Sequence, residues 1–161
     1  MSKRRESPGV VLRALWAWLA PLPGGKWLFG RLVGWAAPYS DTLGVRVLAL
    51  EPGFARVCMV DRRRVHGHLG SIHAMALANV AELASALAML AGLPDGVRGI
   101  QTGFSITYLK KARGTITAEC RCPPAATDAD GDYEAEAVLR DPAGDVVARG
   151  IALWRLGRFP A

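Results

Sequence analysis

Residues 70–82 read Gly70-Ser-Ile-His-Ala-Met-Ala-Leu-Ala-Asn-Val-Ala-Glu82. They open an apolar run from Ala74 to Ala91, whose only polar side chains are those of Asn79, Glu82 and Ser85. A run of this length without glycine or proline predicts a long helix over residues 72–90, ending at Gly92 and Pro94. Because this helix is apolar almost all round, we expect it to be covered on every side, with more apolar surface than one small sheet can cover.

Glu82 is the single carboxylate of that helix. Removing an ionised carboxylate from water is costly unless a partner compensates for the lost hydration. Two interpretations follow: Glu82 is paired, with an arginine or with Asn79 and backbone groups, or it serves in chemistry. We favour the second, because carboxylates held in clefts are often functional.

A turn rich in glycine and histidine, His66-Gly67-His68-Leu69-Gly70, lies just before the helix. Free backbone N–H groups collect at such a turn and at the helix N-terminus that follows it. A carboxylate within a few turns of these donors suits attack on a carbonyl group. The spacing of His66, His68 and His73 is not a usual zinc pattern and no cysteine lies nearby, so the sequence predicts no metal site.

The composition indicates one globular domain with a substantial core. The chain has 161 residues, of which 51% are hydrophobic and 21% charged, and its net charge is +6. No long basic run with interleaved aromatic residues is present, so we expect no nucleic-acid partner. Cys58, Cys120 and Cys122 form an odd set that is not a disulfide framework, and we expect them to be small buried side chains in a cytoplasmic protein.

The N-terminal segment predicts two helices, over residues 9–20 and 26–37. The first resembles a short signal sequence, but Arg13 interrupts it and Pro21 and Pro23 follow without a cleavage site. It is also too short to span a bilayer, and a loose contact with a membrane surface is the less favoured alternative. We expect it to pack on the domain or on a dimer partner, with packing roles for the tryptophans Trp16, Trp18, Trp27 and Trp35. Residues 1–37 then form a helical extension and residues 38–161 the main domain.

The rest of the chain is predicted to be strands and turns. Residues 43–50 and 54–61 indicate a hairpin around Pro52-Gly53, and four strands follow the central helix at 99–109, 115–122, 133–140 and 146–156. Asp141-Pro-Ala-Gly144 joins the last two with the chemistry of a type I turn. The predicted class is α+β, with an antiparallel sheet wrapped around one central helix.

This order of elements, with this motif at the helix start, resembles the hotdog fold. It is similar in particular to the acyl-CoA thioesterase branch that includes phenylacetyl-CoA thioesterases, and to a bacterial group in that branch known as a domain of unknown function. Gly70-Ser-Ile-His-Ala74 matches the turn of that branch, and Glu82 stands where the branch carries its Asp or Glu. The segments 99–112 and 141–144 look like its third strand and final hairpin, so the resemblance covers roughly residues 35–157.

The resemblance implies a role for individual residues. Glu82 is the general base or nucleophile, the Ala74 N–H holds the thioester oxygen, and His73 shapes the turn. Gln101 stands where relatives carry a water-orienting polar residue. Gly67 replaces the asparagine of the family, and His66 or His68 is the candidate substitute for the lost donor.

The resemblance also implies a ligand and an assembly. Coenzyme A is expected only as part of an acyl-CoA substrate, with no separate cofactor. Its phosphates are expected to meet the basic side chains of Arg62, Arg63, Arg64, Lys110, Lys111 and Arg113, unless these only form a solvated surface. Hotdog proteins build the acyl site between protomers, so a homodimer or homotetramer is expected.

Acyl-CoA hydrolysis is the function that the resemblance favours. Two alternatives stay open. One is a hotdog dehydratase or hydratase, since His68 and Glu82 have the fourteen-residue spacing of some such enzymes. The other is a non-catalytic module that binds an acyl-CoA or a fatty acyl group, which the loss of the family's asparagine and glycines favours.

Overall fold

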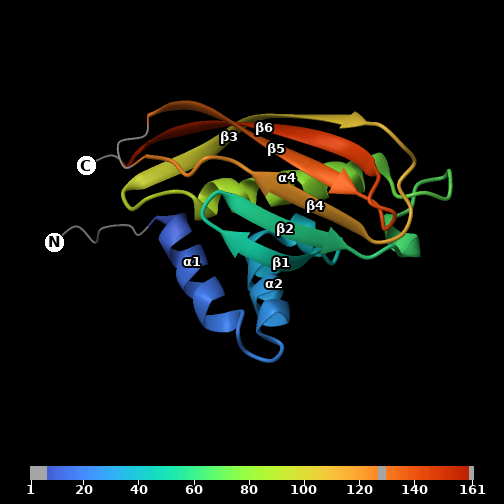
Figure 1. Cartoon of the computed structure of the whole chain (residues 1–161), viewed down its shortest axis with the longest axis horizontal. Coiled ribbons are helices and arrows are strands. Elements are labelled where there is room, and N and C mark those ends of the chain that lie inside the picture. The colour runs from blue at the N-terminus through green and yellow to red at the C-terminus, as the bar shows by residue number, and fades with distance from the viewer. Residues whose placement is uncertain (1–6, 127–129, 160–161) are drawn as a thin grey trace.

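A computed structural model describes residues 7–126 and 130–159, and its centre is a single antiparallel sheet. The six strands are arranged in the order β1-β2-β4-β5-β6-β3 (Figure 1). Their bounds are β1 Arg46–Glu51, β2 Phe54–Met59, β3 Val97–Tyr108, β4 Ile116–Arg121, β5 Gly131–Arg140 and β6 Val146–Arg158. The helices are α1 Pro8–Leu19, α2 Gly25–Ala36, α3 Pro38–Asp41 and α4 Ala74–Ala91, with a 3₁₀ turn, η1, at Arg63–Val65.

The two predicted hairpins form where their turn residues place them. Gly53, between β1 and β2, has a φ of +74° and lies so close to the Cys122 carbonyl that a Cβ would collide with it. Between β5 and β6, one oxygen of Asp141 accepts hydrogen bonds of 3.0 Å from both the Ala143 and the Asp145 N–H. Local turn chemistry therefore fixes both pairings, as the sequence predicts.

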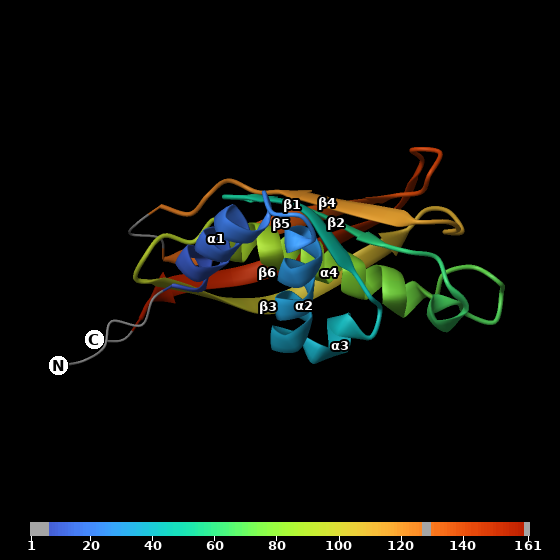
Figure 2. The same ribbon diagram turned by 90° about the horizontal axis from the view of Figure 1, so that it is seen from below.

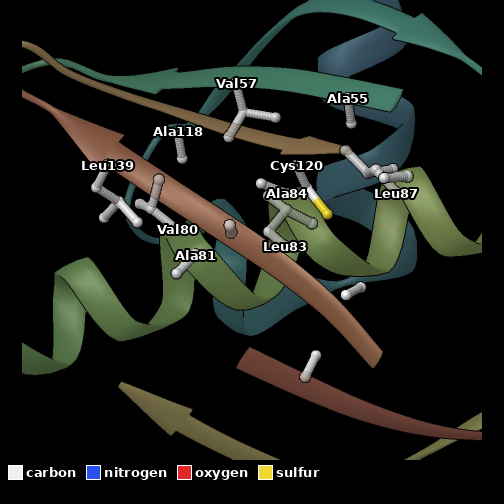
Figure 3. Close-up of a cluster of buried hydrophobic side chains, with 14 of the residues drawn as sticks. Ala55, Val57, Val80, Ala81, Leu83, Ala84, Leu87, Ala118, Cys120 and Leu139 are labelled. Carbon is white, nitrogen blue, oxygen red and sulfur yellow. The ribbon is translucent and has the colours of Figure 1, made fainter. Parts of the chain in front are cut away.

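Helix α4 runs through the concavity of the sheet and forms the core with it. Figure 3 shows its apolar side chains meeting those of β2, β4 and β5. Gly150 of β6 lets the helix approach closely, because a Cβ at that position would lie 2.8 Å from the Ala81 Cβ. The three cysteines are free and buried, as expected. The predicted α+β hotdog arrangement is confirmed.

One side of α4 is not fully covered within the described part of the chain, so the cover expected on every side is incomplete in a single protomer. Asn79, Glu82, Ala86 and Leu90 are only half-buried, and their spacing of three or four residues places them on one face. By length and composition α4 would also qualify as a membrane span, yet 67% of it is buried inside the fold. Its apolar character is therefore explained by its place in the core.

The N-terminal helices lie along the β1 side of the molecule (Figure 2). Arg13 of α1 donates to the carbonyls of Ala91 at 2.6 Å and Leu93 at 3.0 Å, and so caps the C-terminal end of α4. Trp16 packs edge-on against Phe29 of α2, with ring centroids 5.0 Å apart.

The other N-terminal tryptophans do not pack within the described part of the chain, and packing on a second copy stays a prediction. Trp18, Trp27 and Trp35 are 70%, 67% and 85% exposed. The sequence could not reveal this, because α1 and α2 cover the domain with only part of their surface and leave the rest to the solvent.

Candidate active site

The segment between η1 and α4 folds into a closed turn. His66 and Ile72 form a β-bridge, and the Gly67 N–H donates to the Ser71 carbonyl at 2.9 Å. Gly70 has a φ of +64°, which a residue with a side chain adopts only with strain. The turn therefore brings the chain back on itself and delivers it into the first turn of α4.

His73 is the N-cap residue of α4. Its Nδ1 accepts a hydrogen bond from the Met75 N–H at 3.1 Å, and its own N–H donates to the Val65 carbonyl at 2.8 Å. Ala74 is the first residue of the helix. Among the described residues no hydrogen bond engages the Ala74 N–H, so it is a free donor at the positive end of the helix dipole.

A cavity of about 460 Å³ lies in front of this helix start. Its wall includes Gly67, His68, His73 and Ala74 of the motif, together with residues 108–112 after β3. The structure thus brings together the turn and the proposed oxyanion donor, and it adds the basic side chains of Lys110 and Lys111.

Tyr108 is a site residue that the sequence analysis missed. Its hydroxyl donates to the Ala74 carbonyl at 3.0 Å and so ties the first turn of α4 to the end of β3. Partial burial raises the pKa of the Tyr108 phenol. The available signal in the sequence was the position of Tyr108 as the last residue of the alternating strand.

Asp61 is a second residue that the sequence analysis missed. One of its oxygens pairs with His66 Nε2, and the other accepts a hydrogen bond from the Gly114 N–H at 2.6 Å. These two contacts, that with His66 first, hold the pKa of the Asp61 carboxyl below its usual value. Asp61 therefore links the histidine turn to the segment before β4, and the paired His66 does not line the cavity.

Glu82 is half-buried on the partly covered face of α4. In the described part of the chain its carboxylate has neither an ion-pair nor a hydrogen-bond partner, so the pairing that the sequence left open is absent there. The nearby Ser85 hydroxyl donates instead to the Glu82 backbone carbonyl at 2.7 Å. Burial raises the pKa of the Glu82 carboxyl.

A single chain does not bring Glu82 to the cavity. Ala74 and Glu82 are eight residues apart on one helix, which corresponds to about 12 Å along its axis at ~1.5 Å per residue. Gln101 is also absent from the cavity wall, and its Oε1 is buried without a partner among the described residues. Within one chain, therefore, the motif and these two polar side chains are separate.

Four of the six basic residues expected to hold coenzyme A line two separate cavities, and Arg63 and Arg113 line neither of them. Lys110 and Lys111 line the cavity at the motif, whereas Arg62 and Arg64 line a different cavity, between α2 and β1. Lys110 is engaged by Asp141 at 2.7 Å and by Asp145 at 2.5 Å. These two carboxylates raise the pKa of the Lys110 ammonium.

No group of three or more histidine, cysteine or acidic side chains that could hold a metal ion occurs within residues 7–126 and 130–159. What the described site offers is a helix N-terminus, a free backbone donor and the ammonium of Lys111, beside Lys110, which is already paired with Asp141 and Asp145. These groups favour an anionic or polarised oxygen as the ligand.

The six-stranded sheet around a central helix, with a turn and a free donor at the helix start, defines a hotdog protein of the thioesterase type. Comparison with known proteins gives the family. The family model described as Domain of unknown function (DUF4442) matches residues 25–156, and the chain belongs to this family. No curated protein sequence matches the chain.

Solved structures match the whole fold. A crystal structure from a genomics programme is 28% identical, with a TM-score of 0.80, and the match covers 93% of this chain and 99% of the other. A Pseudomonas aeruginosa protein described as a probable thioesterase is 26% identical, with a TM-score of 0.73 and coverage of 86% and 97%. A thioesterase family protein from Silicibacter pomeroyi shares the fold at 20% identity, with a TM-score of 0.68 and coverage of 81% and 96%. Thioester hydrolysis is therefore a plausible activity of this fold.

Proposed function

We propose that the protein hydrolyses acyl thioesters of coenzyme A. The observation that carries this proposal is the free Ala74 N–H, which stands at the positive end of α4 in the wall of a cavity. A donor in this position can hold the oxygen of a thioester carbonyl as negative charge develops on it. The probable thioesterase from Pseudomonas aeruginosa supports the same reaction class.

Glu82 supplies the second group that the reaction needs. The raised pKa of the Glu82 carboxyl suits a general base, because a carboxylate with a pKa nearer to neutral pH accepts a proton from water more readily. In the proposed reaction Glu82 takes a proton from a water molecule, whose oxygen bonds to the carbonyl carbon; alternatively the Glu82 carboxylate attacks that carbon, and water then hydrolyses the resulting anhydride. The carbon–sulfur bond breaks, the thiolate of coenzyme A leaves and takes up the proton, and the products are a carboxylic acid and free coenzyme A.

The helix geometry leads us to propose that two chains share each site. Reacting atoms must approach to about 3–3.5 Å, whereas Glu82 and the Ala74 N–H of one chain are separated by about 12 Å of helix. We therefore assign the Ala74 donor to one protomer and Glu82 to a second copy of the chain. The half-buried face of α4, which carries Asn79, Glu82 and Ala86, is the surface that would meet the substrate and the second copy.

Two variants test the catalytic assignment. Ala74→Pro removes the N–H at the first helical position, where proline is well tolerated, and should lower kcat/KM by about 10²–10³-fold. Ala74→Gly is the matched control, because it keeps the donor and should retain activity. Glu82→Gln keeps the side-chain size and should lower the rate by about 10²–10⁴-fold.

The assay follows a panel of acyl-CoA substrates by release of free thiol and by the absorbance of enoyl products. Thiol release that depends on both groups supports hydrolysis. Enoyl formation that depends on His68 and Glu82 would instead identify a dehydratase or hydratase. Tight binding without either product would identify a binding module, and thiol release unaffected by Ala74→Pro and Glu82→Gln would show that the catalytic residues lie elsewhere.

A further inference from the structure

The outward face of α2 carries large apolar side chains next to a cation. Trp27, Leu28, Arg31, Leu32 and Trp35 are all exposed. At about 100° of rotation per residue, these five positions fall on one continuous arc of about 140°. Phe29 and Gly34 lie outside this arc and are buried. The helix therefore packs through one side and presents an aromatic and leucine face on the other, called here the α2 face.

Further exposed apolar groups lie close to it in the chain. Trp18 and Leu22 lie at the end of the α1–α2 hairpin, and Tyr39 is on α3. In Figure 1 the hairpin projects from the sheet on the β1 side, with its turn at the far end. A single exposed leucine is ordinary, but a contiguous set of tryptophans and leucines indicates a surface that meets a partner.

A cationic cavity adjoins the α2 face. It has a volume of about 560 Å³, lies between α2 and β1, and is lined by Trp27 and by five cationic side chains, Lys26, Arg31, Arg46, Arg62 and Arg64. Among the described residues Asp41 is the single acidic side chain in its wall, and it pairs with Arg31 at 3.4 Å. Arg62 Nε is buried without a hydrogen-bond partner among the described residues. The cavity therefore favours an anion with several acceptor oxygens, such as a phosphate group.

We propose that the α2 face binds the surface of an anionic lipid bilayer. Trp27, Leu28, Leu32 and Trp35 enter the boundary between headgroups and acyl chains, where tryptophan is favoured because its ring is apolar and its N–H is polar. The cationic cavity holds the phosphates of acidic lipids, and its positive charge attracts the negative surface of the bilayer.

The charge of this region selects a lipid surface over other partners. A two-fold contact between copies through the α2 face would bring two sets of five cations together, with one carboxylate on each side to offset them. A nucleic acid would satisfy the cations but leave Leu28 and Leu32 without an apolar environment. An anionic bilayer matches the cations and the apolar side chains at once.

Co-sedimentation of the full chain with lipid vesicles tests the proposal. We expect binding to vesicles of equal parts phosphatidylcholine and phosphatidylglycerol, and far weaker binding to phosphatidylcholine alone. The double variant Trp27→Ala, Trp35→Ala should weaken binding by about tenfold for each tryptophan removed. The double variant Arg31→Gln, Arg46→Gln should weaken it by about fivefold for each charge removed, and should reduce its dependence on salt.

A control variant and a mass measurement complete the test. Ile100→Ala with Arg155→Gln changes an exposed apolar and an exposed cationic residue on β3 and β6, and should bind like the parent. Circular dichroism confirms that each variant is folded. The proposal is overturned if the protein binds vesicles with and without acidic lipid equally, or if folded variants of the α2 face bind like the parent. It is also overturned if light scattering shows that Trp27→Ala with Trp35→Ala halves the mass, because the α2 face would then be a contact between copies.

Discussion

Mixed oligomers of two inactive variants test whether each active site is shared between two chains. One chain carries Glu82→Gln, which removes the carboxylate but keeps its size. The other carries Ala74→Pro, which removes the N–H at the first position of α4. Because about 12 Å of helix separates the two positions, and Glu82 does not line the cavity at Ala74, we expect that the two groups of one chain serve different carbonyls.

The size of the expected effect follows from counting sites. Each pure variant lacks one group in every site, so its activity should fall by about 10²-fold or more. Random exchange of equal amounts makes half of the dimers mixed. Each mixed dimer has one site with both groups and one with neither, so the mixture should recover about a quarter of the parent activity. This is about 25-fold or more above either pure variant.

The assay is thiol release from an acyl-CoA after the two variants are unfolded together and refolded. Separate affinity tags on the two chains allow the mixed dimer to be purified, and its activity should then approach half that of the parent. Each variant refolded with itself is the control for recovery caused by refolding alone.

Two results would refute the reasoning. A purified mixed dimer with no more activity than the pure variants would mean that Glu82 and the Ala74 N–H act within one chain, or that one of them has no catalytic role. A parent protein that stays at the 17.2 kDa of one chain in light scattering while it hydrolyses acyl-CoA would exclude the shared site altogether.

Three further predictions concern pH, stability and salt. Because burial raises the Glu82 pKa, kcat/KM should rise with pH through a midpoint above the ordinary value of 4.5. The fold favours the protonated Glu82 carboxyl, so the parent loses stability as pH rises through that raised pKa. At neutral pH, Glu82→Gln should therefore unfold at a higher temperature than the parent. Below the ordinary pKa of the carboxyl, the two proteins should unfold at the same temperature. Tyr108→Phe removes the bond to the Ala74 carbonyl and should lower the free energy of unfolding by about 0.5–1.5 kcal/mol in denaturant titrations, whereas exposed Tyr39→Phe should not change it. Salt should lower kcat/KM for an acyl-CoA more than for a pantetheine thioester, and Lys111→Ala with Arg113→Ala should flatten this dependence; equal slopes for both substrates would exclude a phosphate contact.

The sequence was sufficient for the fold because the decisive signals are local. The apolar run after Gly70 predicted a long helix, and the turns at Pro52-Gly53 and Asp141–Gly144 predicted the hairpins on either side of it, which together favoured a core helix over a membrane span. The boundary of α4 was two residues off at its start, since His73 caps the helix with its own side chain. That cap depends on the closed turn around it, which periodicity does not encode.

The candidate site was only partly predictable. The turn and Ala74 were predicted because they are contiguous in the chain. Asp61 and Tyr108 were missed because they reach the motif from other elements, through contacts with His66 and with the Ala74 carbonyl. The basic residues were expected from two segments of the chain, and the sequence could not tell that Lys110 and Lys111, rather than Arg62 and Arg64, line the cavity at the motif.

The sequence by itself determined which elements form and which of them carries the motif, because helix periodicity, strand alternation and turn chemistry act over a few residues. Only the tertiary structure decided which surfaces are covered. It leaves Glu82 without a partner among the described residues, on a half-buried face of α4, and it exposes Trp27 and Trp35 beside a cationic cavity. Burial depends on contacts between segments that are distant in the sequence. The local sequence around a tryptophan therefore does not distinguish a buried position from an exposed one.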